Sequence, residues 1–126
     1  MSEIPKSNQP VLDTKTLEEL AATTDAEFVG DLIDTFTADS PELLAQLRQA
    51  LADRNAETFR RAAHSLKSNG NSLGALALAT QARELEMQGK AGTIDGSAAA
   101  VESLAAELEK TARELQKLRR DRERQF

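Results

Sequence analysis

The sequence predicts an all-α protein, an antiparallel up-and-down four-helix bundle with a short additional helix at the N-terminal end. Its 126 residues include no Trp, no Tyr and only four Phe, and they are rich in Ala, Leu, Glu, Arg and Gln, which form helices well. Apolar residues recur every three or four positions along successive segments, as on one face of an amphipathic helix. No segment alternates as a strand does, and the short connections predict antiparallel neighbours.

The first residues are expected to form a flexible tail over 1–12, because they are polar, contain two prolines and show no apolar period. Asp13 or Thr14 can then cap a short helix over TKTLEELAA. Glu18 and Glu19 would lie near the positive end of that helix, where carboxylates are stabilising.

The next helix has Thr24 or Asp25 as its candidate N-cap and extends to about Asp53. Its apolar stripe consists of Phe28, Val29, Leu32, Ile33 and Phe36, continued by Leu44, Leu47 and Leu51. Pro41 fits the first turn of a helix capped by Ser40. The sequence therefore leaves two possibilities, a new helix starting at this proline or one long helix that bends there.

Three further helices complete the predicted bundle. The first of them runs from about residue 56 to 73 and is broken by Gly74, and the second runs from about 75 to 88, where GKAG ends it. Asp95 is the expected N-cap of the last helix. The apolar positions of that helix have a near-heptad spacing: Val101, Leu104, Leu108, Thr111, Leu115 and Leu118. We expect the bundle to span residues 13–119.

Composition excludes several classes of function. The chain has no Cys and one His, so it has no disulfide or thiolate metal site, and a zinc site is improbable. Its longest apolar stretch, ALALA, is far too short to span a bilayer, and the N-terminus lacks the apolar core of a signal peptide. Together these features predict a cytoplasmic protein without a cofactor.

Charge is distributed unevenly along the chain. The formal net charge is −5, and the basic residues concentrate after residue 109, including the expected tail over 120–126. An acidic body disfavours nucleic acid as the main partner. The basic end could contact nucleic acid or an anionic membrane, but positive residues commonly occupy a helix C-terminus. We expect neither nucleic acid nor membrane as a partner.

The single histidine, His64, is predicted to point away from the core. A helix turns by about 100° per residue, which puts the apolar residues of this helix on the side opposite His64. Lys67 lies about 60° from His64 around the helix, Arg60 and Ser68 within about 40°, and Asn71 within about 20°. The imidazole therefore lies on a polar, cationic face.

The segment after His64, SNGNS, is a poor helix former. Its small side chains leave the ring accessible to a bulky partner, and Gly70 points toward the core, where close approach of a neighbouring helix explains it. No acidic residue lies one turn from His64 on this helix to orient it as a base. An exposed imidazole beside cations can act as a nucleophile toward phosphorus, with Lys67 and Arg60 meeting the phosphoryl oxygens. Because nucleotide-binding motifs are missing, another protein must supply the phosphoryl group.

The stretch AHSLKSNGNSLGA resembles the signature of histidine-containing phosphotransfer (HPt) domains of bacterial phosphorelays. In that signature Leu follows the histidine by two positions, Lys by three, and Gly-Ala by ten and eleven. The corresponding residues are His64, Leu66, Lys67, Gly74 and Ala75. The flanking segments, FTADSPELLAQLRQAL and LATQARELEMQGKAG, also look like the helices of this family.

The resemblance covers about residues 13–118 and implies a four-helix bundle that shuttles phosphoryl groups between aspartates of receiver domains. Such domains have no kinase activity, and the magnesium belongs to the receiver. His64 would be the phosphorylated residue and Lys67 its charge-stabilising neighbour. Response-regulator receivers and a hybrid histidine kinase are the implied partners. Many members have Gly where this chain has Ser68, which bears on how closely a receiver approaches.

Two sets of residues are expected to support this role. The receiver-docking surface would comprise Arg60, Arg61, Ser68 and Asn71, and the helix-packing glycines would be Gly70 and Gly74.

Two alternatives compete with this interpretation. The first is a non-catalytic helical adaptor that binds a receiver or kinase without carrying phosphate, although such a protein need not keep the pair of His64 and Lys67. The second is an oligomerising coiled coil over 97–124. Its apolar positions end at Leu118, and Arg122 stands where the next one is required.

Overall fold

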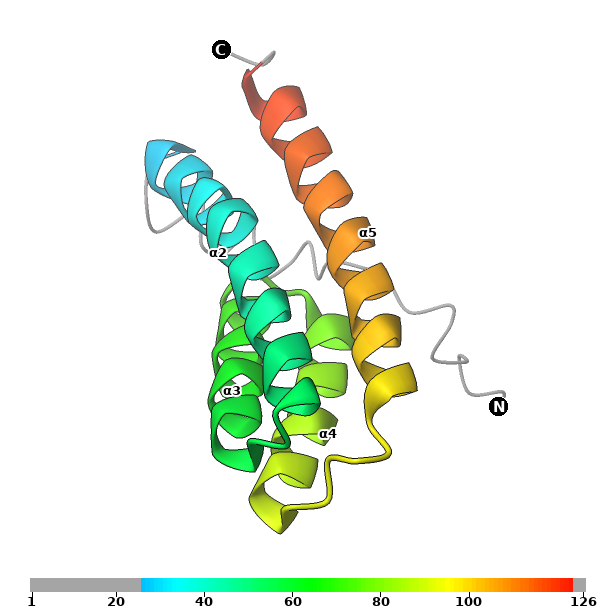
Figure 1. Cartoon of the computed structure of the whole chain (residues 1–126). Helices are drawn as coiled ribbons and strands as arrows, with labels where there is room; N and C mark the ends of the chain where they lie inside the picture. The colour runs from blue at the N-terminus through cyan, green and yellow to red at the C-terminus, as the bar shows by residue number, and fades with distance from the viewer. Residues whose placement is uncertain (1–25, 124–126) are drawn as a thin grey trace, which may run out of the picture.

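The computed structural model describes residues 26–123, and this part of the chain is a bundle of α-helices without a strand (Figure 1). The helices are α2 (Ala26–Ala52), α3 (Ala56–Ser72), α4 (Leu76–Ala91) and α5 (Ala98–Glu123). The predicted all-α fold is confirmed. The expected tail over 1–12 and the short helix after it, with the caps proposed up to residue 25, lie outside the described residues.

The four helices pack in a ring. α2 contacts α3 and α5, and α4 contacts the same two helices from the other side. α2 and α5 are much longer than α3 and α4, so they extend past the α3–α4 pair at one end of the bundle (Figure 1). α5 also runs through the first residues of the segment 120–126.

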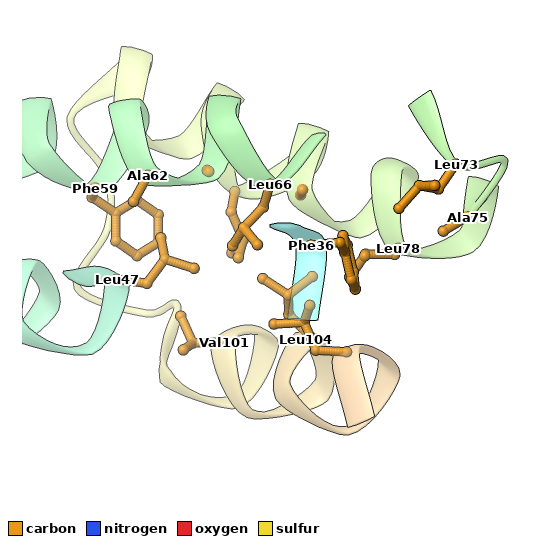
Figure 2. Packing of buried hydrophobic residues seen from close by; sticks show 14 of the residues in the cluster. Phe36, Leu47, Phe59, Ala62, Leu66, Leu73, Ala75, Leu78, Val101 and Leu104 are labelled. Carbon is orange, nitrogen blue, oxygen red and sulfur yellow. The ribbon is translucent and has the colours of Figure 1, made fainter. Parts of the chain in front are cut away.

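Residues from all four helices form one hydrophobic core, in which Phe59, Ile33, Leu47 and Leu66 are completely buried. Figure 2 shows labelled side chains from the four helices meeting between them. Thr111 is buried as well, and its hydroxyl donates to the carbonyl of Glu107. Most residues of the predicted stripes are therefore buried in the core, and Leu32, Leu44, Leu51 and Leu118 are half-buried and pack against it. Phe28 is the exception, because 45% of it is exposed.

The segment around Pro41 belongs to one continuous helix, which decides between the two possibilities. Pro41 lies inside α2 on its exposed side, and the preceding Ser40 is buried. The proline has no N–H to donate to the carbonyl four residues earlier, but a 27-residue helix that packs on both α3 and α5 tolerates that loss.

Two helix ends differ from the prediction. α4 does not end at about residue 88 but continues through Gly89 to Ala91, where the left-handed φ of 74° at the following residue, Gly92, closes the helix. α5 begins after Ser97 rather than Asp95: the carbonyl of Ser97 accepts from the N–H of Val101 at 2.9 Å, and its hydroxyl donates to the side chain of Gln88. At both ends the tertiary contacts of Gly89 and Ser97 outweigh the local sequence preferences, which are for glycine to end a helix and for Asp95 to cap one.

Candidate functional site

His64 lies on α3 with its side chain 54% exposed. Asn55 helps to begin this helix, since its side chain accepts from the N–H of Thr58 at 3.1 Å. Phe59 and Leu66 are buried on the opposite side of the helix, and burial of these apolar side chains fixes its rotation. His64 therefore points to solvent, as its position in the periodic pattern predicts.

A carboxylate from α4, Glu86, binds the side chains of both His64 and Lys67 on α3. Oε2 of Glu86 lies 2.5 Å from Nδ1 of His64, and Oε1 accepts from Nζ of Lys67 at 2.7 Å. The Glu86 side chain is only 5% exposed. A neutral imidazole that faces a carboxylate carries its proton on the nearer nitrogen, so Nδ1 donates to Glu86. The lone pair is left on Nε2, the nitrogen that Glu86 does not occupy.

The hydrogen bond from Lys67 is the main reason why the pKa of Glu86 is lowered, and the hydrogen bond from His64 adds to it. Burial acts in the opposite direction but is outweighed. Glu86 is therefore ionised at neutral pH and supplies one buried negative charge to two donors. Charge-assisted hydrogen bonds of this kind are stronger than neutral ones.

Two glycines bring α3 and α4 close enough for Glu86 to reach across. A Cβ on Gly89 would lie 2.8–3.0 Å from Cβ, Cα and N of Arg60, and a Cβ on Gly70 would lie 3.2 Å from the carbonyl oxygen of Ala75. Gly74 has another function: its φ of 73° is left-handed, so it makes the turn between the helices.

The expected docking residues lie on the same face but not all are directed toward His64. Ser68 and Asn71 are exposed, one turn and two turns beyond His64. Arg60 and Arg61 both bind Glu57, at 2.6 Å and 3.2 Å. The hydrogen bond from Arg60 is the main reason why the pKa of Glu57 is lowered to about 2. In this structure the charge of Arg60 is thus directed to Glu57 rather than to His64.

Sequence reasoning missed Glu86. The helical pattern tests only for an acidic partner on the helix of His64 itself, whereas the partner lies 22 residues away on the neighbouring helix. The spacing does offer a signal, because Glu86 lies four positions after Ala82 and seven after Ala79, which puts it on the same helix face as these two small apolar residues. A carboxylate on the buried face of a helix requires a partner.

Across the described residues, no group of three or more His, Cys, Asp or Glu side chains is arranged to bind a metal ion. None of the helices in that range is long and apolar enough to cross a membrane.

Comparison with known proteins gives two matches. The family model of the Hpt domain matches residues 31–124, which include His64, Lys67 and Glu86. The structure is similar to the crystal structure of histidine-containing phosphotransfer protein B from Pseudomonas aeruginosa PAO1, with a TM-score of 0.84 and 31% sequence identity. That match covers 90% of this chain and 98% of the other. No match was found among the curated proteins.

Proposed function

The chain belongs to the Hpt domain family, and we propose that His64 accepts a phosphoryl group from a receiver phosphoaspartate and passes it to an aspartate of another receiver. One observation carries this proposal: Glu86 lies 2.5 Å from Nδ1 of His64, so the lone pair is on Nε2 of a half-exposed ring. The sequence resemblance and the similarity to a histidine-containing phosphotransfer protein support the same role.

In the forward step, Nε2 attacks the phosphorus of the aspartyl phosphate. The nitrogen–phosphorus bond forms while the bond from phosphorus to the carboxylate oxygen breaks, and aspartate leaves as a carboxylate. The ring then carries a positive charge with its proton still on Nδ1, and the charge of Glu86 offsets it. Transfer to the next receiver is the reverse reaction on a different aspartate.

Lys67 has the role of stabilising the phosphoryl oxygens. Its ammonium group is bound to Glu86 and its side chain is 26% exposed. The flexible lysine side chain can turn one N–H toward a phosphoryl group on Nε2 while another stays on Glu86. Arg60 is a weaker candidate than its sequence position indicates, because Glu57 already holds its guanidinium group.

The protein would act as a phosphoryl carrier without kinase activity of its own. Its sequence has neither a GxxxxGK[ST] nor a GxGxxG motif to bind a nucleotide. A hybrid histidine kinase and response-regulator receivers are the proposed partners, and the receiver would supply the magnesium ion.

The test is a phosphotransfer assay with pre-phosphorylated receivers from the same genome, using the wild-type chain and the variant His64→Gln. We expect label on the wild type alone, in the acid-labile and base-stable form of a phosphohistidine. Circular dichroism checks that the variant folds, which we expect because His64 contributes nothing to the core. Label on folded His64→Gln contradicts the assignment of His64. Tight receiver binding without transfer to the wild type shows an adaptor instead.

A further inference from the structure

A second feature lies beside His64, on the side of α3 that faces α2. It is a groove of about 330 Å³ between the two helices. Its lining residues are Asp39, Glu42, Leu43 and Gln46 of α2 and Ser65 and Asn69 of α3. Ser65 directly follows His64, whereas Lys67 and Glu86 lie on the α4 side of the histidine. A partner that covers His64 can therefore reach the groove.

The groove is negatively charged and its charge is not compensated. Asp39 and Glu42 are exposed and lie three positions apart on α2, and their side-chain carboxylates make no hydrogen bond or ion pair within residues 28–120. Two other exposed carboxylates are neutralised by neighbouring cations: Glu57 binds Arg60, and Glu102 binds Arg48 at 2.7 Å. No lining residue of the groove is basic.

The rest of the lining fits one kind of side chain. Leu43 is half-buried and offers an apolar surface for a chain of methylene groups. Gln46, Ser65 and Asn69 each carry a side-chain oxygen that can accept a hydrogen bond. An apolar stem that ends in a cation with several N–H donors matches this combination, and only lysine and arginine have that structure.

His64 thus lies between two regions of opposite character. On the α4 side Lys67 attracts the negative phosphoryl group, and on the α2 side the groove attracts a positive side chain. We propose that the groove formed by Asp39 and Glu42 receives a lysine or arginine from the contact surface of the receiver, and that this contact selects the receiver and orients it over His64. The inference rests on the proposed function and adds the chemistry of the partner to it.

The test reverses the charge of the groove with Asp39→Lys combined with Glu42→Lys. Its matched control is Glu109→Lys combined with Glu114→Lys, two exposed carboxylates on α5, which packs against α2 and α4. Transfer from a phosphorylated receiver is measured at low salt and expressed relative to labelling by phosphoramidate, a small donor that needs no docking. This ratio separates docking from the reactivity of His64.

We expect the groove variant to lower the ratio at least about tenfold, because steering between opposite charges changes association rates by about 10- to 1000-fold. We expect the control variant to retain the wild-type ratio. Added salt should reduce the difference in ratio between the groove variant and the wild type. If receivers transfer to the wild type and equally to the groove variant, the inference is overturned and the proposed function stands. If no receiver transfers to the wild type, both are overturned.

Discussion

The two helix pairs of the bundle are held together in different ways. α3 and α4 meet through Gly70 and Gly89, where a single Cβ would contact backbone atoms of the partner helix. α2 and α5 are bridged at the surface by ion pairs such as Arg48–Glu102, and an apolar groove of about 350 Å³ remains between them. Figure 1 shows these two longer helices extending beyond the shorter pair.

This difference corresponds to a division of function. The hydrogen bonds from His64 and Lys67 to Glu86 cross from α3 to α4, so their lengths depend on the spacing of these two helices. Misplacing a reactive group by about 1 Å can lower a rate about 100-fold. α2 and α5 contribute core residues, and in our proposal α2 also forms one wall of the docking groove. Neither contribution requires such accuracy. The rate of phosphotransfer should therefore be more sensitive to changes in the contact between α3 and α4 than to changes in the contact between α2 and α5.

The largest effect is expected from Gly89→Ala. The new Cβ would lie 2.8 Å from Cβ and 2.9 Å from Cα of Arg60, so α3 and α4 must move apart. Overpacking of this kind lowers the free energy of unfolding by about 1–3 kcal/mol. The better helix propensity of Ala offsets up to about 1 kcal/mol of that loss. We expect a lower melting temperature and slower phosphotransfer, measured by thermal unfolding and by the receiver assay.

The matched control is Gly30→Ala on α2, where a Cβ would lie 3.5 Å from Nε of Arg119, the end of a flexible side chain. Here only the helix propensity should change, which raises stability by up to about 1 kcal/mol. If Gly89→Ala lowers the stability and Gly30→Ala raises it, the result supports a tight contact at α3–α4 that is absent at this position of α2. If Gly89→Ala stabilises the protein as Gly30→Ala does, the close contact has no energetic importance.

The same contact shows why the fold was easier to predict than the site. Helix positions follow from apolar periodicity, which is local in the sequence and places residues such as Leu66 and Leu104 in the core. The continuation of α4 through Gly89 is not local, because glycine ordinarily marks the end of a helix. Only the position of Arg60 on the neighbouring helix explains why glycine is required within this one.

Glu86 was missed for a related reason. The partner of His64 depends on the rotation and axial position of α4 relative to α3, and helical periodicity determines the rotation only to within a broad face. The Gly-Ala pair after the histidine indicates a turn, but it does not fix which side chain of α4 faces Nδ1. The roles of His64 and Lys67 came from chemistry and resemblance, whereas their bridging carboxylate required three-dimensional contacts.

A smaller effect is expected when Glu86 is protonated. Its pKa in the folded protein is lowered from 4.5, first by the hydrogen bond from Lys67. The unfolded chain therefore binds the proton more tightly, so stability from this group is present above pH 4.5 and is lost as the pH falls through the folded pKa. We expect a loss on the order of 1 kcal/mol, measured by denaturant unfolding between neutral and acidic pH.

The comparison protein for this measurement is Glu86→Gln, which has no carboxyl group to titrate at this position. Its stability should lie below that of the wild type at pH 7, and the difference should shrink as the pH falls below 4.5. Because Glu86 is buried, moderate salt should change this difference little. A difference that is constant with pH would show that the bridge to His64 and Lys67 does not stabilise the folded state.

The smallest effect is expected from Glu102→Gln, which removes the ion pair between α2 and α5. The side chains of Arg48 and Glu102 are 50% and 60% exposed, so water and salt screen their attraction and both groups are well solvated when separated. We expect a melting temperature within about 2 °C of the wild type and an unchanged rate of transfer from the receiver. A marked destabilisation that salt reproduces in the wild type would mean that α2 and α5 depend on this surface pair. The α3–α4 pair and the α2–α5 pair would then differ in the kind of interaction that joins them, and not in the strength of that interaction.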